Sequence, residues 1–406
     1  MKIVHIVTQD SYGAGRAAIR ISEALNNAGQ ESKVCVIDKQ SDAKVVYLGD
    51  GFKNKLQVKI YNKLNNFKNR KIVKDGYFQV EKYGRSFSEV SEIKDADIIH
   101  IHWINDGFWS ESFWNHLLKL KKPIVCTLHD MWHFTGGCHY DNYCNKYVEG
   151  CNNCPMLIRP ADRDASYNAS IQKIHYFCKS KMLFVGCSSW ITNEFNKSYI
   201  AKQSKKSCIC IPNSICDRIF KKNDKYACRE ILNLPKDKKL ILFGALASTS
   251  DARKGYDHIK EALKILDSEK YELVLFGSEV VNDFDGFTIH NMGYIRDDLH
   301  LALLYGASDC FVAPSIQENL ANTVMESLSC GTPAVAFNIG GMPDMIKHRE
   351  NGYLAEAFSE KDLAYGIQYC TDNCDTLGEE AVSFVRNSFS EARVADLYIK
   401  AYKSML

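Results

Sequence analysis

The segment that most constrains the fold of this chain is the strand, loop and helix pattern of residues 310–333. The apolar run at 310–313 predicts a short buried strand, and a Pro-Ser turn follows it. Apolar residues then recur at helical spacing until Gly331, and Pro333 lies just beyond. The pattern therefore predicts a buried strand that leads through a polar loop into a helix.

Two carboxylates belong to this segment, Glu318 in the loop and Glu326 about two turns inside the predicted helix. At about 1.5 Å of rise per helical residue, they should lie roughly 10 Å apart. This is at or beyond the upper limit, roughly 9.5 Å, for two carboxylates that flank one glycosidic bond. It suits groups that accept hydrogen bonds from opposite ends of a long ligand. Between them, the helix N-terminus near Asn319 and Leu320 offers backbone N–H groups to a diphosphate, which indicates a sugar nucleotide.

The Glu-x7-Glu spacing, with the Pro-Ser loop before it and Gly-Thr-Pro after it, resembles the signature of retaining family 4 glycosyltransferases of the GT-B fold. The bacterial enzymes of surface-polysaccharide synthesis are of this type. The resemblance implies that Glu318 contacts hydroxyls of the donor sugar and that Glu326 contacts the ribose. It covers nearly the whole chain and is most specific over residues 240–345. The alternative is an exposed loop Glu and a solvated helix Glu.

Length and composition set the broad class. The 406 residues exceed one ordinary core, and 46% hydrophobic with 25% charged residues is typical of a globular protein. A net charge of +2 gives no general attraction to nucleic acid. No apolar run approaches the roughly 20 residues that span a bilayer, and residues 1–7 predict a strand rather than a signal peptide. We therefore expect a cytoplasmic protein able to work at the inner face of the cytoplasmic membrane, its 16 cysteines mostly reduced.

Strands and helices are predicted to alternate along the chain, which favours an α/β fold with doubly wound parallel sheets. The family resemblance implies GT-B architecture, with two Rossmann-like domains facing across a cleft. We expect an acceptor-side domain over residues 1–215 and a nucleotide-sugar-binding domain over 216–388. Residues 389–406 are predicted to form a helix, capped by Ser390, that returns to the first domain.

In the first domain, a glycine loop at residues 9–16 is predicted between a strand and a helix that starts at Ala17. Gly13 and Gly15 would let a ligand approach the backbone closely, although the pattern is no dinucleotide fingerprint. The loop resembles the family loop that faces the donor diphosphate and the acceptor. A plain tight turn is the alternative.

A histidine, His129, follows the buried strand predicted at residues 123–128. The stretch resembles the family position whose histidine approaches the donor sugar from the first domain. His102 and Asp130 are its neighbours in this interpretation. A purely structural hydrogen-bonding histidine is the alternative.

In the second domain, a strand at 240–244 and a loop of small residues lead to Arg253 and Lys254. The resemblance implies that these cations hold the donor diphosphate, so that no catalytic metal is required. Family members typically carry an arginine where this chain has Ala245, and Arg253 would supply that charge. The stretch with Tyr294 and Ile295 resembles the loop that holds the nucleotide base.

A cysteine-rich insertion occupies residues 135–155. Its spacing, Cys-x5-Cys-x6-Cys-x2-Cys, predicts a closed structural zinc site, whose ligands would be Cys138, Cys144, Cys151 and Cys154. Free thiols or reversible disulfides are the alternatives.

A basic segment follows the first strands, at residues 52–74. It carries apolar residues on one helical stripe (Leu56, Ile60, Leu64 and Phe67) among many lysines. Such a helix can lie on an anionic membrane, or it can pack on its own domain with a solvated basic face.

Taken together, these features predict a transferase that moves a sugar from a nucleotide-diphosphate donor to a hydroxyl acceptor with retention, in capsular or other surface polysaccharide synthesis. The expected acceptor is a carbohydrate or a lipid-linked glycan, and no nucleic acid is expected. The alternatives are a sugar-nucleotide epimerase, a phosphorylase-like enzyme with a pyridoxal lysine, and a non-catalytic binding protein.

Overall fold

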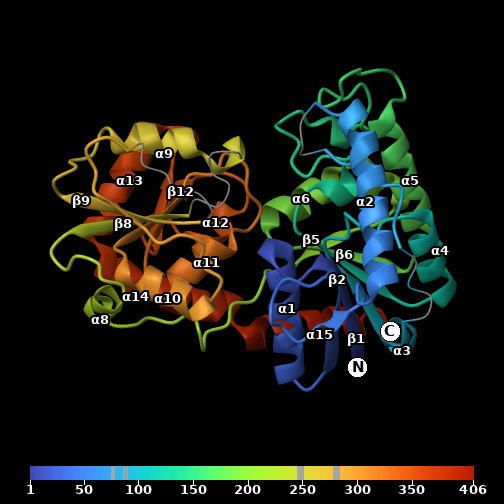
Figure 1. Cartoon of the computed structure of the whole chain (residues 1–406), viewed down its shortest axis with the longest axis horizontal. Coiled ribbons are helices and arrows are strands. Elements are labelled where there is room, and N and C mark those ends of the chain that lie inside the picture. The colour runs from blue at the N-terminus through green and yellow to red at the C-terminus, as the bar shows by residue number, and fades with distance from the viewer. Residues whose placement is uncertain (75–77, 86, 88–89, 245–250, 278–283) are drawn as a thin grey trace. The chain divides into compact units, whose positions relative to one another are not determined.

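The computed structural model describes residues 1–74, 78–85, 87, 90–244, 251–277 and 284–406 (Figure 1). The chain divides into two compact units. Unit 1 comprises residues 1–214 with 394–406, and unit 2 comprises residues 215–393. Ala245 and the loop of small residues predicted at 245–250 lie outside the described residues.

Unit 1 is built on a parallel sheet of seven strands in the order β3-β2-β1-β4-β5-β6-β7. Its strands are β1 (Lys2–Gln9), β2 (Glu31–Asp38), β3 (Val46–Tyr47), β4 (Ile98–Ile101), β5 (Ile124–Leu128), β6 (Met182–Gly186) and β7 (Cys208–Cys210). The strand order reverses between β1 and β4. In open parallel sheets, ligands bind beside the carboxyl ends of the strands at such a switch point.

Helices cover both faces of this sheet. They are α1 (Tyr12–Asn27), α2 (Phe52–Ile72), α3 (Ser91–Asp95), α4 (Glu111–Leu120), α5 (Ala165–Lys179), α6 (Ser189–Lys197), α7 (Tyr199–Ser204) and α15 (Glu391–Lys403). The side chain of Ser110 caps α4 and that of Asp164 caps α5, each accepting backbone N–H bonds. The terminal helix α15 packs Val394, Tyr398 and Tyr402 against the core below β1 and β4, as the predicted returning helix requires.

Unit 2 has a parallel sheet of six strands in the order β10-β9-β8-β11-β12-β13. Its strands are β8 (Lys239–Gly244), β9 (Tyr271–Phe276), β10 (Ile289–Asn291), β11 (Cys310–Ala313), β12 (Ala334–Phe337) and β13 (Gly352–Ala355). Its helices are α8 (Lys225–Ile231), α9 (Tyr256–Leu263), α10 (Asp298–Ala307), α11 (Asn322–Ser329), α12 (Met342–Met345), α13 (Glu360–Asp372) and α14 (Cys374–Phe389). The order reverses between β8 and β11, so the prediction of two doubly wound parallel sheets is confirmed.

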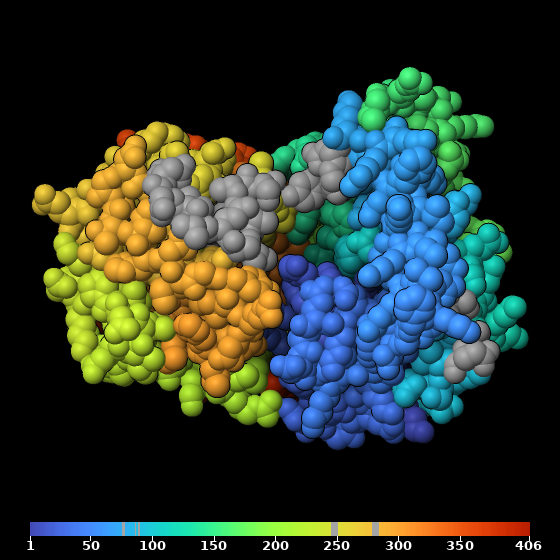
Figure 2. Space-filling view, in the orientation of Figure 1, coloured from blue at the N-terminus to red at the C-terminus, as the bar shows by residue number. Residues whose placement is uncertain are grey.

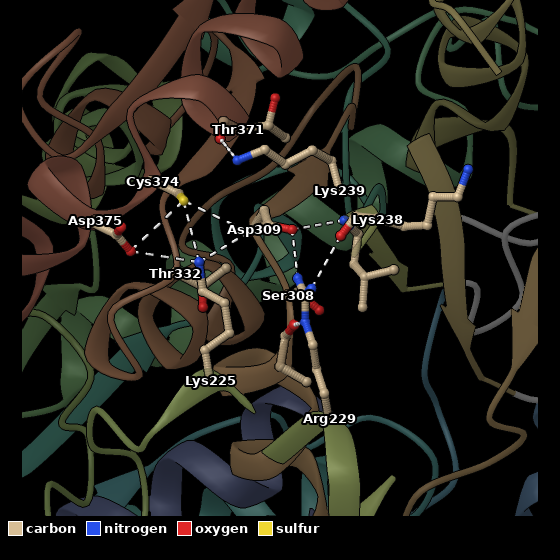
Figure 3. Close-up of polar contacts among 12 residues, drawn as sticks. Lys225, Arg229, Lys238, Lys239, Ser308, Asp309, Thr332, Thr371, Cys374 and Asp375 are labelled. Atoms are coloured by element: carbon tan, nitrogen blue, oxygen red, sulfur yellow. Dashed lines mark hydrogen bonds and ion pairs between the residues drawn. The ribbon is translucent and has the colours of Figure 1, made fainter. Parts of the chain in front are cut away.

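A buried ion-pair network holds α8 to the amino ends of the central strands of unit 2 (Figure 3). Asp309 accepts hydrogen bonds from Arg229 at 2.6 Å, from Lys225 at 2.9 Å and from the backbone N–H of Leu240 at 2.8 Å. The remaining guanidinium N–H groups of Arg229 donate to backbone carbonyls, including that of Ala307. Because these charges are paired and hydrogen-bonded, the network tolerates its burial.

The first helix starts earlier than the sequence predicted. Helix α1 begins at Tyr12, so Gly13 and Gly15 lie in its first turn and not in a preceding loop. A Cβ atom at Gly15 would lie 2.3 Å from the carbonyl oxygen of Gln9. The absence of a side chain at Gly15 therefore lets the helix pack directly on the end of β1, although glycine has a low helix propensity.

No helix among the described residues is long and apolar enough to cross a membrane.

Candidate active site

The cations and the carboxylate predicted from the sequence lie together at the switch point of unit 2. Lys254 Nζ is 2.7 Å from Glu318 Oε2, and Arg253 Nη1 is 3.3 Å from the same oxygen. Lys254 ends the short helical turn Ala252–Lys254 after β8, and Glu318 lies in the loop after β11. Arg253 is also held by Asp251, at 3.0 Å. The site is therefore formed where two neighbouring parallel strands end.

Glycines make this arrangement possible. Gly255 has φ of +73°, and a Cβ there would lie 1.8 Å from the carbonyl oxygen of Pro314. The turn with Arg253 is pinned to the second loop, because Ile316 N–H donates to the Arg253 carbonyl at 2.8 Å. Gly340, at φ of +52°, lies equally close to the backbone of Glu318. A larger residue at Gly255 would push the turn with Arg253 away from the loop after β11, and one at Gly340 would push the loop after β12 away from Glu318.

Glu318 is ionised in this environment. Burial alone would raise its pKa, but the charges of Lys254 and Arg253 and a backbone hydrogen bond lower the pKa of Glu318 to about 2. That backbone bond comes from the N–H of Asn319, 3.2 Å from Oε1.

The second carboxylate, Glu326, is buried inside α11. It accepts a hydrogen bond from the hydroxyl of Tyr305, on α10, at 3.1 Å. Helix α11 begins at Asn322 with no side-chain cap, and Asn319 and Leu320 lie buried just before it. Its first backbone N–H groups are therefore directed to the same end of the sheet as Glu318.

The loop predicted to hold a base follows β10. It is anchored to the end of β9, because Gly277 N–H donates to the carbonyl of Gly293 at 2.8 Å. Ile295 is buried, whereas Tyr294 is exposed and has the Arg296 guanidinium 5.7 Å from its ring centroid. Buried Ile295 and the exposed ring of Tyr294 thus lie, like Glu318, in loops that follow the carboxyl ends of strands of this sheet.

Unit 1 contains the other predicted side chain, His129, at the end of a hydrogen-bonded chain of histidines. His5 Nδ1 is 2.9 Å from His102 Nε2, and His102 Nδ1 is 2.9 Å from His129 Nε2. His5 and His102 are fully buried, and His129 is partly buried. His100 lies beside them and bonds Tyr402 and Thr127, each at 2.7 Å. The chain runs along the switch point between β1 and β4.

These imidazoles are neutral. Burial lowers the pKa of His5 to about 3 and that of His129 to about 4. Burial, with repulsion from neighbouring histidines, holds the pKa values of His100 and His102 well below the usual range. Neutral His129 can act as a hydrogen-bond donor or acceptor toward a ligand, but it brings no positive charge.

Unit 1 also has a pocket of about 650 Å³ at the carboxyl ends of β1, β2 and β4. Trp103 and Tyr47 supply aromatic rings, and Asp38 and Asp106 supply carboxyl groups. Further lining residues come from helix α2, and they are Lys55, Val58, Lys59, Asn62 and Asn66. Aromatic faces among amide and carboxyl groups suit a polyhydroxylated ligand.

The four cysteines of the predicted zinc site lie in one irregular region. Cys138 donates a hydrogen bond to Cys154, and this bond lowers the pKa of Cys154 to about 7. Gly136 N–H donates to the Cys151 sulfur at 3.0 Å. Among the described residues, however, only one group of three or more His, Cys, Asp or Glu residues has its ligand atoms all within 4.8 Å of one another. This group is His5, His100 and His102. The four thiols thus lie in the same region, but their sulfur atoms are not as close to one another as the ligands of one metal ion would be.

Sequence reasoning missed His5, His100 and the pocket. The signal for the histidines was present, because both are polar residues inside apolar strand runs, and β1 pairs with β4 at this point. A buried polar residue in a central strand needs a partner, and here the partners are other histidines. The pocket combines ends of three strands with a distant helix, so no local pattern indicated it.

Part of the chain matches a known protein family. Residues 237–373 match the family model described as Glycosyl transferases group 1. This range includes Arg253, Lys254, Glu318 and Glu326.

Two curated relatives align with part of the chain. One is an uncharacterized glycosyltransferase of Methanocaldococcus jannaschii, 28% identical over 155 residues, 36% of this chain and 38% of that protein. The other is the putative colanic acid biosynthesis glycosyl transferase WcaC of Escherichia coli, 27% identical over 263 residues, 62% of this chain and 60% of that protein. The alignments thus span less than two thirds of either relative.

The whole chain superposes on solved glycosyltransferase structures. A sucrose-phosphate synthase from Thermosynechococcus elongatus has a TM-score of 0.69 at 17% identity, with 99% of this chain and 98% of that chain covered. Anabaena HepE in complex with UDP has a TM-score of 0.64 at 15% identity, with both chains fully covered. At these identities the likeness concerns the fold, and the predicted GT-B fold is confirmed. The sequence matches support a glycosyltransferase function.

Proposed function

We propose that this protein transfers a sugar from a nucleotide-diphosphate donor to a hydroxyl acceptor, with retention of the anomeric configuration. The observation that carries the proposal is the group formed by Lys254, Arg253 and Glu318 at the switch point of unit 2, within the segment that matches the glycosyltransferase family. A buried, ionised carboxylate flanked by two cations supplies both hydroxyl recognition and diphosphate neutralisation.

Each residue of this site has a part in the proposal. Glu318 accepts hydrogen bonds from donor-sugar hydroxyls, and Glu326 accepts them from the ribose. Lys254 and Arg253, with the first N–H groups of α11, hold the diphosphate. Asn319 and Leu320 line its path, and the loop with Tyr294 and Ile295 holds the base, as the placement of these residues at one sheet edge supports.

The proposed reaction needs no side-chain nucleophile. The bond from the anomeric carbon to the leaving phosphate oxygen breaks, and the acceptor oxygen bonds to the same face of that carbon. The acceptor proton passes to the departing phosphate. Lys254 and Arg253 stabilise the charge that grows on this phosphate, so no catalytic metal is required. For unit 1, the proposal is that neutral His129 offers a hydrogen-bonding group to the sugar, and that Gly13 and Gly15 at the start of α1 let the ligand approach the backbone.

For the acceptor, we propose a carbohydrate, free or carried on a lipid, of the kind used in capsular or other surface polysaccharide synthesis. The pocket of unit 1 favours this class, because Trp103 and Tyr47 offer faces for a sugar ring. The name of the Escherichia coli relative, a putative colanic acid biosynthesis glycosyl transferase, agrees with it. The proposed location is the cytoplasm, at the inner face of the cytoplasmic membrane.

The cysteine-rich segment belongs to the proposal as a structural zinc site with four thiolate ligands. Two observations support it. The four cysteines lie in one region of unit 1, and backbone N–H groups donate to two of the sulfur atoms, from Gly136 to Cys151 and from Lys146 to Cys144. Zinc at about 2.3 Å from each sulfur would draw the thiols to roughly 4 Å from one another. Elemental analysis of protein purified without chelators should find about one zinc per chain. Metal-free protein with four titratable thiols would refute the site and leave the transferase proposal intact.

A panel of nucleotide sugars tests the proposed function. One member should raise Tm and should slowly release its nucleoside diphosphate when no acceptor is present. A ligand at 100 times its Kd should add about 2.7 kcal/mol to the free energy of unfolding. An epimerase would change the sugar without releasing nucleotide, a phosphorylase-like enzyme would show pyridoxal absorbance, and a binding protein would leave the donor intact.

A further inference from the structure

Helix α2 of unit 1 is oriented opposite to an ordinary surface helix. Its apolar stripe lies on the solvent side, where all five residues are substantially exposed: Phe52 81%, Leu56 46%, Ile60 47%, Leu64 43% and Phe67 60%. At about 100° per residue these positions fall within about 120° of the helix circumference. Helix α2 packs on its own unit through the opposite side, where Asn65 and Asn69 are buried, but the apolar stripe takes no part in this packing. Figure 2 shows α2, in light blue, as an uncovered ridge.

Polar residues fix the helix in this orientation. Asn65, fully buried on the opposite side, donates to Glu81 at 2.5 Å and accepts backbone N–H bonds from Lys82 and Tyr83. Asn69, one turn further, accepts the N–H of Val80 at 3.1 Å. An inward-facing Leu64 would require a rotation that breaks these bonds, so the exposed apolar stripe is a built feature of the fold.

The charged residues of the segment that contains α2 are all basic. Residues 52–74 contain no Asp or Glu, and their basic residues are Lys53, Lys55, Lys59, Lys63, Lys68, Arg70, Lys71 and Lys74. By helical position, Lys53, Lys63 and Lys71 flank or interrupt the apolar stripe, and the ammonium group of Lys71 lies 4.1 Å from the Phe67 ring centroid. A partner of complementary chemistry has an apolar interior and an anionic surface.

We infer that the outer face of α2 docks unit 1 onto a bilayer that contains anionic lipids. The side chains of the stripe would enter the boundary between headgroups and acyl chains, and the lysines would contact lipid phosphates. An acidic protein is a less suitable partner than a bilayer. Five large apolar side chains in one continuous stripe are buried most completely by lipid, because lipid can rearrange around each of them.

The docking surface also deepens the proposed function, and this step rests on that function. The inner flank of the same helix lines the 650 Å³ pocket with Lys55, Val58 and Lys59. An acceptor whose polar head enters the pocket can thus remain anchored by a lipid in the membrane that α2 contacts. The substrate class that this arrangement suits is a lipid-anchored sugar phosphate, with Lys55 and Lys59 as partners of its phosphate.

Sedimentation of the full chain with large vesicles tests the docking. Phosphatidylcholine vesicles with 30% phosphatidylglycerol should bind the protein, and pure phosphatidylcholine vesicles should bind it far more weakly. Leu56→Gln/Ile60→Gln/Leu64→Gln should reduce the partition coefficient on anionic vesicles at least tenfold. The matched control, Ile171→Gln/Ile231→Gln/Ile265→Gln, replaces apolar residues of similar exposure elsewhere and should bind like the wild type.

The charge contribution is tested in the same assay. Lys53→Gln/Lys63→Gln/Lys71→Gln should weaken binding on the order of a hundredfold, and added salt should have the same direction of effect. The control Lys202→Gln/Lys361→Gln/Lys403→Gln removes equal charge from exposed positions outside α2 and should change binding little. Wild-type protein that ignores anionic vesicles at low salt overturns the inference. So does a dimer, seen by light scattering, that the stripe variant converts to monomer.

Donor hydrolysis in solution separates this inference from the proposed function. The stripe variant should hydrolyse the donor at the wild-type rate and lose transfer only to a vesicle-anchored acceptor. A wild-type chain that binds vesicles but consumes no nucleotide sugar would refute the function and keep the docking surface. Equal transfer by the stripe variant to the vesicle-anchored acceptor would refute the lipid-anchored substrate.

Discussion

In unit 1 the buried polar groups beside the switch point are imidazoles bonded to one another, whereas in unit 2 they are carboxylates bonded to cations. His5, His102 and His129 form a neutral chain. Glu318 and Asp309 are each ionised between basic side chains. Two sheets of the same type therefore carry different polar groups: a line of neutral imidazoles in unit 1, and carboxylates paired with cations in unit 2.

The difference indicates a division of labour. Under the proposed function, Lys254 and Arg253 in the loops of unit 2 would supply the fixed cations that a nucleoside diphosphate needs. His129 and the pocket of unit 1 would supply the oriented donors and acceptors that a neutral sugar and a hydroxyl acceptor need. Neutral histidines also cost less burial energy than charges would.

The largest expected effect is that acid destabilises unit 1 at a higher pH than unit 2. The pKa values of His5, His129 and His133 are lowered to about 3, 4 and 3, below the usual value near 6.5, so the unfolded chain binds more protons. Their contribution to stability is complete above pH 6.5 and is lost progressively as the pH falls toward their folded-state pKa values of about 3 to 4. Each can contribute about 1.4 kcal/mol per pH unit within its own window, and the lowered pKa values of His100 and His102 act in the same direction.

Unit 2 should lose stability only at a lower pH than unit 1. The pKa of Glu318 is lowered to about 2 from a usual 4.5, so its contribution is lost only between pH 4.5 and 2. All five tryptophans belong to unit 1, so their fluorescence reports that unit alone. Fluorescence should change between pH 6 and 4, while pepsin at pH 4 should release intact fragments of unit 2. Loss of unit 2 before the fluorescence change would contradict the comparison.

The second effect concerns the charged site. Lys254→Ala removes the closest cation from Glu318 and from the proposed leaving phosphate, and should reduce kcat about a hundredfold or more, on the order of 3 kcal/mol. Lys254→Arg should recover part of the rate, because a planar guanidinium places its charge differently. EDTA should leave the wild-type rate largely unchanged. Near-normal turnover of Lys254→Ala, or dependence on added magnesium or manganese, would place the leaving-group chemistry elsewhere.

The strands and the charged site could be predicted because their signals are local. Apolar runs gave β1, β5, β8 and β11, and short spacings gave Lys254, Glu318 and Glu326. Features set by distant contacts could not be predicted. The start of α1 depends on the end of β1, and the outward stripe of α2 depends on Asn65 meeting residues 81–83. The histidine chain likewise needs the pairing of β1 with β4.

The third effect tests whether the neutral chain is continuous. His102→Phe keeps the ring volume but leaves ring nitrogens of His5 and His129 without a partner, and should lower the free energy of unfolding by about 2–4 kcal/mol. His5→Phe leaves a single nitrogen unpaired and removes Nε2 of His5, which already lacks a partner in the described structure, so its cost should be smaller. Urea unfolding followed by tryptophan fluorescence measures both. If both substitutions lowered the free energy of unfolding equally, the three histidines would not form one continuous hydrogen-bonded row.

The smallest effect concerns Glu326. Glu326→Ala should weaken donor binding about tenfold, because ribose contacts exist in both the ground and transition states and kcat should change little. Tyr305→Phe removes only the hydroxyl that bonds Glu326 and serves as the control, with donor affinity close to that of the wild type. Isothermal titration calorimetry measures both affinities. Unchanged donor affinity in Glu326→Ala would refute the ribose role.

The central claim is that the charged loops of unit 2 hold the nucleotide sugar, and hydrogen exchange with and without the donor tests it most directly. The nucleotide sugar that raises Tm most is the probe. Its presence should slow exchange in residues 251–255 and 314–326, and the effect should be lost in Lys254→Ala. Protection confined to unit 1, or none in either loop at saturating donor, would contradict the account.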